Sequence, residues 1–271
     1  CDWSSDVCSS DLDDARRTGG WLMSLLYQLD ASVVGTMFSD TGKTTQITDG
    51  GAVAAWTAPN GSVTTDCLQS TLANRPLYRA NYSSSGYAAV EFDGSNDAMS
   101  VAHSAAWNVS ILDVLMVITS TSLATGTYRG IIGKWTNSSW NDGWGLTYSL
   151  GNFSIGAPTY TNVVCKAVIN SRILIHCHFE SGCNGCDNGN VYGGGTAGTG
   201  PQNNSGSVLI GRADSSGAYH FQGALNELRV YSGGETDATL VSVKNALRAK
   251  WGLNSVASGK PQIPFMQQVI G

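Results

Sequence analysis

Two histidines and two cysteines form the densest group of potential metal ligands in this sequence. His176 and His178 flank Cys177, and Cys183 and Cys186 follow with C-x-x-C spacing. Alternate residues of a strand face the same way, so the two histidines would share a face, and a C-x-x-C turn can return two thiolates. This spacing is compatible with a tetrahedral zinc site of His176, His178, Cys183 and Cys186. A Cys183–Cys186 disulfide and two free thiols are the alternatives, and all three states stay open.

Other cysteines could also pair. Cys165 and Cys177 lie symmetrically about the turn at Asn170 and Ser171, so they would face each other across a hairpin, either as a second disulfide or as two core positions. Cys67 has no evident partner.

A second group combines aromatic rings with amides in the segment KWTNSSWNDGWGLTYS. Flat rings stack on the C–H faces of sugars, while amides and carboxylates bind hydroxyls, so this segment predicts a shallow glycan-binding groove. Trp140 is the expected exposed platform, whereas Trp144 is expected in the core. The candidate ligand-binding residues are Trp140, Trp135, Asn137, Asn141, Asp142 and Tyr148.

Paired carboxylates for glycoside hydrolysis are not evident. A retaining glycosidase needs two carboxyl groups about 5 to 5.5 Å apart, one on each side of the scissile bond. Glu91 is followed by Asp93 only at a turn, and Glu227 is expected to pair with Arg229, two residues further on the same strand face. The sequence therefore predicts no catalytic residues.

The turn after Phe92 offers oxygen ligands. Asp93, Asn96 and Asp97 could hold calcium, but the same side chains also cap the backbone of a turn by themselves. We expect no obligatory cofactor, with calcium here and zinc at the histidines as the two open alternatives.

Short strands separated by Gly, Asn, Asp and Ser clusters would position these groups. Their expected ranges are 88–92, 111–119, 128–134, 144–150, 163–168, 172–180, 207–212 and 224–231. Near the end, Leu240, Val243, Leu247 and Trp251 form one stripe of a helix that Thr236 or Asp237 would cap and Gly252 would close. The pattern predicts an all-β protein with one C-terminal helix.

Composition sets limits on partners and domains. The 271 residues carry 15 basic and 20 acidic side chains, a net charge of -5, which gives no basic surface for nucleic acid. No run of about 18 apolar residues is present, so no membrane span is expected. The first twelve residues resemble a translated sequencing adapter. We therefore expect an artefactual or disordered segment at 1–28, one domain at 29–253 and an extended tail at 254–271.

Several segments, in order, carry a family resemblance. QSTLANRPLY at 69–78, AAVEFDGSNDAMSV at 88–101, IIGKW at 131–135, VLIGR at 208–212 and FQGALNELRVYSG at 221–233 resemble the concanavalin-A-like lectin/glucanase superfamily. The nearest branch is the laminin-G-like jelly-roll domain of bacterial secreted and phage virion proteins. The resemblance implies a two-sheet antiparallel jelly-roll sandwich and says little about activity.

Together these observations favour a non-catalytic carbohydrate-binding or adhesion module, extracellular or on a phage virion, with a glycan or cell-surface polysaccharide as partner. The alternative is a structural virion decoration or tail protein without glycan binding, whose apolar tail from Phe265 to Ile270 contacts another virion protein. A glycan hydrolase or lyase is the least favoured interpretation, because the sequence shows no acid/base residues suited to it.

Overall fold

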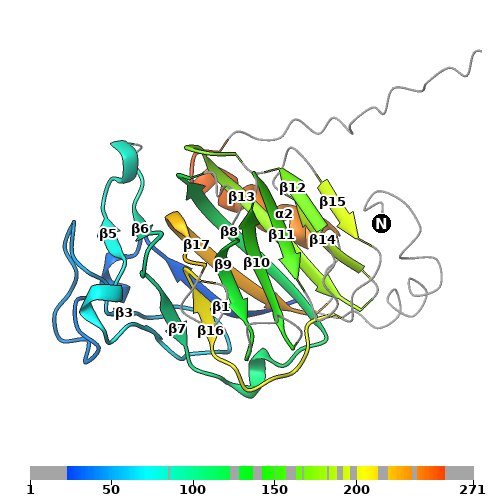
Figure 1. Ribbon diagram of the computed structural model, residues 1–271, viewed down its shortest axis with the longest axis horizontal. Helices are drawn as coiled ribbons and strands as arrows, with labels where there is room; N and C mark the ends of the chain where they lie inside the picture. The colour runs from blue at the N-terminus through cyan, green and yellow to red at the C-terminus, as the bar shows by residue number, and fades with distance from the viewer. Residues whose placement is uncertain are drawn as a thin grey trace, which may run out of the picture.

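The computed structural model describes residues 23–84, 86–122, 128–136, 142–149, 151–156, 163–166, 168–181, 183–187, 192–195, 200–212, 219–233 and 237–253. Within these residues the strands form two antiparallel sheets that pack face to face (Figure 1). The expected fold class, an all-β two-sheet sandwich with one C-terminal helix, is confirmed. No helix in the described part of the chain is long and apolar enough to cross a membrane.

Sheet A has eight strands in the order β15-β14-β13-β8-β17-β6-β5, with β1 also paired to β17. Its members are β1 (Ser24–Asp30), β5 (Leu77–Arg79), β6 (Ala89–Asp93), β8 (Ile111–Ser120), β13 (Arg172–Glu180), β14 (Cys183–Asp187), β15 (Tyr192–Gly195) and β17 (Gln222–Ser232). The long strands β8, β13 and β17 lie at its centre.

Sheet B has nine strands in the order β12-β11-β10-β9-β16-β7-β4-β3-β2. Its members are β2 (Met37–Phe38), β3 (Ala55–Trp56), β4 (Cys67–Leu68), β7 (Met99–Val101), β9 (Arg129–Lys134), β10 (Trp144–Ser149), β11 (Asn152–Gly156), β12 (Val163–Lys166) and β16 (Val208–Ile210). Short 3-10 turns link several strands: η1 (Val34–Thr36), η2 (Leu72–Asn74), η3 (Tyr82–Ser84) and η4 (Ala105–Trp107).

The core lies between the sheets and follows the period-two alternation of the strands. On β13, Ile175, Cys177 and Phe179 are buried against the opposite sheet, as the sequence pattern predicts. Trp144 is fully buried and packs on Trp107 and Phe179, with ring centroids 6.4 and 5.8 Å away. The expected core position of Trp144 is confirmed.

The outer face of sheet A is covered by α2 (Asp237–Lys250) (Figure 1). Leu240, Leu247 and Trp251 pack on apolar residues of β8, β13 and β17. Gly252 follows with a φ of +61°, the left-handed conformation expected at the end of this helix. The helix stripe read from the sequence therefore lies against a sheet.

The alternation of the strands predicts six residues inside the sandwich: Phe92, Ile111, Ile175, Phe179, Leu209 and Leu228. Four of them, Phe92, Ile175, Phe179 and Leu228, lie in its core. Ile111 is only half-buried because it begins β8 at the sheet margin. Leu209 is buried outside the main core, at a register position between Ser100 and Gly133.

Two local expectations differ from the structure. The segments 163–168 and 172–180 do not form a hairpin, because β12 pairs with β11 in sheet B while β13 pairs with β8 in sheet A. The expected pairing of Cys165 with Cys177 across a hairpin is therefore wrong. In addition, β1 begins at Ser24, so part of the segment expected outside the domain is paired with β17.

Candidate functional site

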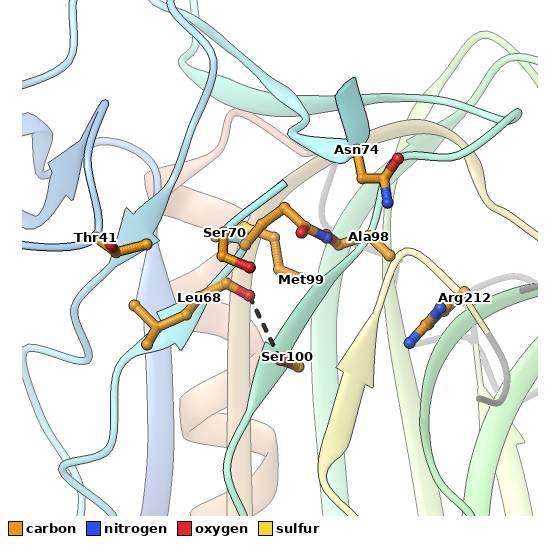
Figure 2. Close-up of a pocket in the computed structure, with 9 residues that line it drawn as sticks. Thr41, Leu68, Ser70, Asn74, Ala98, Met99, Ser100 and Arg212 are labelled. Carbon is orange, nitrogen blue, oxygen red and sulfur yellow. Dashed lines mark hydrogen bonds between the residues drawn. The ribbon is translucent and has the colours of Figure 1, made fainter. Parts of the chain in front are cut away.

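A polar pocket opens where sheet B meets the loops that precede and follow its short strands (Figure 2). Its volume is about 480 Å³, within the roughly 300–1,000 Å³ of small-molecule sites. The lining comes from the loop after β2, from β4 and the residues that follow it, from β7, from the turn around η2 and from the chain just after β16. The lining residues are Thr41, Leu68, Gln69, Ser70, Asn74, Ala98, Met99, Ser100 and Arg212.

One arginine holds the wall of this pocket in shape. Arg75 donates from Nε to the carbonyl of Gln69 at 2.9 Å, from Nη1 to that of Ser39 at 2.9 Å, and from Nη2 to that of Ser70 at 3.0 Å. Three separate backbone carbonyls are thereby fixed around one planar group.

The amide of Gln69 fixes the pocket floor. Its Nε2 donates to the Ala98 carbonyl at 2.6 Å, and its Oε1 accepts from the Thr71 N–H at 3.0 Å. The Ala98 N–H in turn donates to the Asn74 carbonyl at 3.1 Å. The pocket wall is therefore pre-formed, and the Gln69 side chain is bonded to the protein at both ends of its amide.

Other polar groups of the lining are not engaged in this way. Within the described residues, the structure records no hydrogen bond from the hydroxyls of Thr41 and Ser70, the side-chain amide of Asn74 or the guanidinium of Arg212. Leu68 adds an apolar surface that is 36% exposed. The pocket thus offers hydroxyl and amide groups beside an apolar patch, a combination that can orient a small ligand.

The turn behind this pocket uses its carboxylates on its own backbone. Asp93 Oδ1 accepts the N–H groups of Ser95 at 2.7 Å and Asn96 at 3.2 Å, and Asp97 Oδ2 accepts the N–H of Asp93 at 2.9 Å. Burial alone would raise the pKa of Asp93, but these N–H bonds hold it below its usual value. Burial raises the pKa of Asp97 to about 6.

No group of three or more His, Cys, Asp or Glu side chains suited to a metal ion is found in the described part of the chain. The side chain of Asn96 donates to the Ala73 carbonyl at 2.7 Å. The calcium alternative at Asp93, Asn96 and Asp97 therefore gains no support, and the turn accounts for all three residues.

His176 and His178 lie together on the outer face of sheet A, as expected. Both donate to one oxygen of Asp113, from His176 Nε2 at 2.7 Å and from His178 Nδ1 at 2.8 Å, and His178 Nε2 also donates to Glu180 at 3.3 Å. Burial opposes the charge of His178, yet these two carboxylates raise its pKa to about 9. Burial and the charge of Lys244 lower the pKa of His176 to about 4.

Asp113 is the partner that the sequence did not reveal. Its side chain is almost fully buried. Burial alone would raise its pKa, but the hydrogen bonds from the two histidines hold that pKa far below the usual value.

The two cysteines of the predicted zinc site lie on β14, which pairs with β13 so that Cys183 is opposite Glu180 and Cys186 is opposite Cys177. The side chains of Cys183 and Cys186 lie outside the described residues, so the zinc site and the disulfide stay predictions.

The expected aromatic groove is described only in part. Trp140, Asn137 and Asn141 lie outside the described residues. Asp142 is described, and its carboxylate accepts the backbone N–H of Thr136 at 3.1 Å.

The two other aromatic candidates are buried. Tyr148 lies inside the core against Phe153, with ring centroids 5.5 Å apart. Trp135 is 3% exposed and packs outside the main core, against Gly145 and Gly156, where any Cβ would crowd its ring. Neither ring forms an open platform. Tyr148 lies on the inward face of β10, and Trp135 occupies the space left by the missing side chains of Gly145 and Gly156.

The acidic residues weighed for hydrolysis are structural. Glu227 is buried and accepts from Arg229 Nε at 2.7 Å, which confirms the expected pair. Glu91 pairs with Arg79 at 2.6 Å on the edge of sheet A. None of the described residues that line the pocket carries a carboxyl group.

Comparisons with known proteins connect this sandwich with glycosidases. No protein-family profile matches the chain, and no curated protein matches it. Among solved structures, Trypanosoma rangeli sialidase in complex with sialic acid aligns with a TM-score of 0.58 and 10% identity, over 87% of this chain and 34% of that one. The chain therefore spans about a third of the sialidase.

Two further structures are similar. Domain 4 of AbnA, a GH43 extracellular arabinanase from Geobacillus stearothermophilus in complex with arabinotriose, gives a TM-score of 0.50 and 15% identity, over 82% of this chain and 98% of that one. A mutant GH54 α-L-arabinofuranosidase soaked with 4-nitrophenyl α-L-arabinofuranoside gives a TM-score of 0.56 and 12% identity, over 91% of this chain and 67% of that one.

These similarities establish a shared fold and correct two related expectations. All three structures belong to enzymes named for cleaving glycans, which contradicts the expected non-catalytic adhesion module and the expectation that the protein is not an enzyme. The expectation erred because it took the missing carboxylate pair as evidence about the whole protein. At 10 to 15% identity the similarity does not transfer an activity by itself.

Proposed function

We propose that this chain belongs to a glycan-processing enzyme and that the polar pocket beside β4 and β7 binds the saccharide. The observation that carries the proposal is a pre-formed pocket with unused hydroxyl and amide groups around an exposed leucine. The glycosidases that share the sandwich supply the class of reaction.

The pocket's chemistry suits a sugar ring. The apolar side chain of Leu68 would contact ring C–H groups, while Ser70 and Asn74 exchange hydrogen bonds with hydroxyls. Because Arg75 already fixes the surrounding backbone, binding would require little ordering of the wall.

Glycoside hydrolysis needs two carboxyl groups beside the scissile bond. Since the lining has none, the proposal assigns the acid and the base to residues outside the lining, and binding to the pocket itself. The finer laminin-G-like relationship and an extracellular or virion location remain parts of this proposal. They rest on the sequence resemblance alone.

The test measures turnover and binding with the same panel of glycans. The purified chain is incubated with arabinan, sialylated and uronic-acid glycans and 4-nitrophenyl α-L-arabinofuranoside, and released sugar is quantified. Calorimetry then measures saccharide affinity. We expect Asn74→Ala to weaken binding of the recognised saccharide about fivefold, since one hydrogen bond contributes about 1 kcal/mol.

Asn245→Ala is the matched control, because Asn245 is exposed on α2, which packs against the other sheet. It should leave affinity unchanged. Binding without turnover would place the catalytic carboxyl groups outside this chain. Absence of both turnover and saccharide binding across the panel would refute the proposed function.

A further inference from the structure

Among the described residues that line the pocket, Arg212 is the single charged one. It follows β16, where Gly211 has a φ of +86° and a Cβ would lie 2.4 Å from the Phe92 ring. Only glycine fits this bend. The bend places Arg212 beside the pocket opposite Ser70, as Figure 2 shows.

The guanidinium of Arg212 is not used by the fold, so far as the described residues show. Its Nε is buried and has no hydrogen-bond partner among them, and no described carboxylate forms an ion pair with it. Other arginines differ: Arg75 is bonded to three carbonyls, Arg79 to Glu91, and Arg129 to the carbonyls of Gly94 and His220.

The carboxylates of Asp93 and Asp97, in the turn after Phe92, accept hydrogen bonds from backbone N–H groups, and neither forms an ion pair with Arg212. The other unused groups of the described lining are the hydroxyls of Thr41 and Ser70 and the amide of Asn74, and all three can donate to an anion. The pocket therefore combines a positive charge with neutral donors.

We propose that the pocket selects an acidic saccharide, and that the carboxylate of its uronic or sialic acid unit pairs with Arg212. This inference rests on the proposed function and adds the substrate class. A guanidinium presents two parallel N–H donors that match a carboxylate, and a charge-assisted pair is stronger than a neutral hydrogen bond. A hydroxyl of a neutral sugar could accept a hydrogen bond from the buried Nε, but it would leave the positive charge of the guanidinium unpaired.

The test compares acidic and neutral trisaccharides by calorimetry with the full chain. The pairs are 3′-sialyllactose with 3′-galactosyllactose and trigalacturonic acid with galactotriose, and the pair that binds identifies the source of the carboxylate. We expect the acidic member to bind at least tenfold more tightly. Arg212→Gln should remove this preference, and Arg212→Lys should restore it in part because the charge returns without the two-donor geometry.

Arg248→Gln on α2 is the matched control and should leave both affinities unchanged. Thermal unfolding of each variant establishes that it is folded. If Arg212→Gln does not fold, the wild-type preference for acidic over neutral members still decides the inference.

Equal or tighter binding of the neutral member would overturn the inference and leave the proposed function standing. An acidic preference that survives in folded Arg212→Gln would overturn the role of Arg212. If none of the four saccharides binds while a neutral arabinan does, the inference again fails alone. If the wild-type chain binds no saccharide in either experiment, both the inference and the proposed function are overturned.

Discussion

Replacing the buried carboxylate of Glu227 with an amide should cost much more stability than the same change at Glu91. The Glu227 side chain is fully buried, and it accepts hydrogen bonds from β1, β17 and the end of α2. Its donors are Gln28 at 2.9 Å, Arg229 at 2.7 Å, Lys250 at 2.6 Å and Trp251 at 2.7 Å. Glu227→Gln removes the negative charge that pairs with Arg229 and Lys250. It also replaces one of the two acceptor oxygens with an NH₂ group, which cannot accept the hydrogen bonds at the end of α2.

The magnitude follows from burial. Breaking a buried ion pair costs about 3–5 kcal/mol, and since glutamine keeps one acceptor oxygen we expect about 3 kcal/mol. In a domain of this size that corresponds to a fall of roughly 6–12 °C in Tm. Urea unfolding followed by far-UV circular dichroism measures the free energy, and tryptophan fluorescence reports the docking of Trp251.

Glu91→Gln is the matched comparison. Glu91 also pairs with an arginine, at 2.6 Å, but the side chains of Glu91 and Arg79 are 33% and 38% exposed. A pair this exposed contributes up to about 1 kcal/mol. Equal losses in the two variants, or a loss below about 1 kcal/mol for Glu227→Gln, would refute the reasoning that burial decides the value of these pairs.

Three further predictions concern the core, the pocket and pH. Trp144→Ala should lower the free energy of unfolding by about 3–5 kcal/mol in a urea titration, because the ring is fully buried against Trp107. Arg75→Lys should lower the free energy of unfolding by about 2 kcal/mol, because roughly two hydrogen bonds to backbone carbonyls are lost. It should also weaken saccharide binding measured by calorimetry, and unchanged affinity would show that Arg75 does not shape the pocket. Asp97 has a pKa of about 6 in the folded chain, above the roughly 3.9 of an unfolded aspartate, so its stabilising contribution is present at low pH and is lost as the pH rises through 6. Asp97→Asn should therefore gain stability relative to the wild type between pH 4 and pH 7 in parallel unfolding curves, and a constant difference would contradict this.

Strand alternation and the helix stripe were readable from the sequence because both depend on neighbouring residues. Residues 172–180 form β13 with the expected face inward, and Leu240, Leu247 and Trp251 pack on sheet A. Hydrophobic periodicity reports the local geometry of a strand or helix directly. It also showed that His176 and His178 share a face.

Periodicity does not report which strand lies beside which. The hairpin expected from 163–168 and 172–180 is absent because the two segments enter different sheets. The partner of both histidines, Asp113, lies on β8, distant in sequence, and nothing local to it indicates that role. Strand neighbours are selected by the packing of the whole sandwich, which local patterns do not contain.

The candidate pocket shows the same division. Alone, the sequence determined the sandwich class, the glycine-rich turns, the inward faces of the long strands and the segment 69–78 as part of a resemblance, but it pointed to the Trp140 loop for sugar binding. Tertiary structure decided that Thr41, Asn74 and Arg212 line one cavity. In sheet B, β7 pairs with β4 on one side and with β16 on the other, and this pairing brings distant parts of the chain together. A binding site is defined by the convergence of side chains in space, and that convergence exists only once long-range strand pairing is complete.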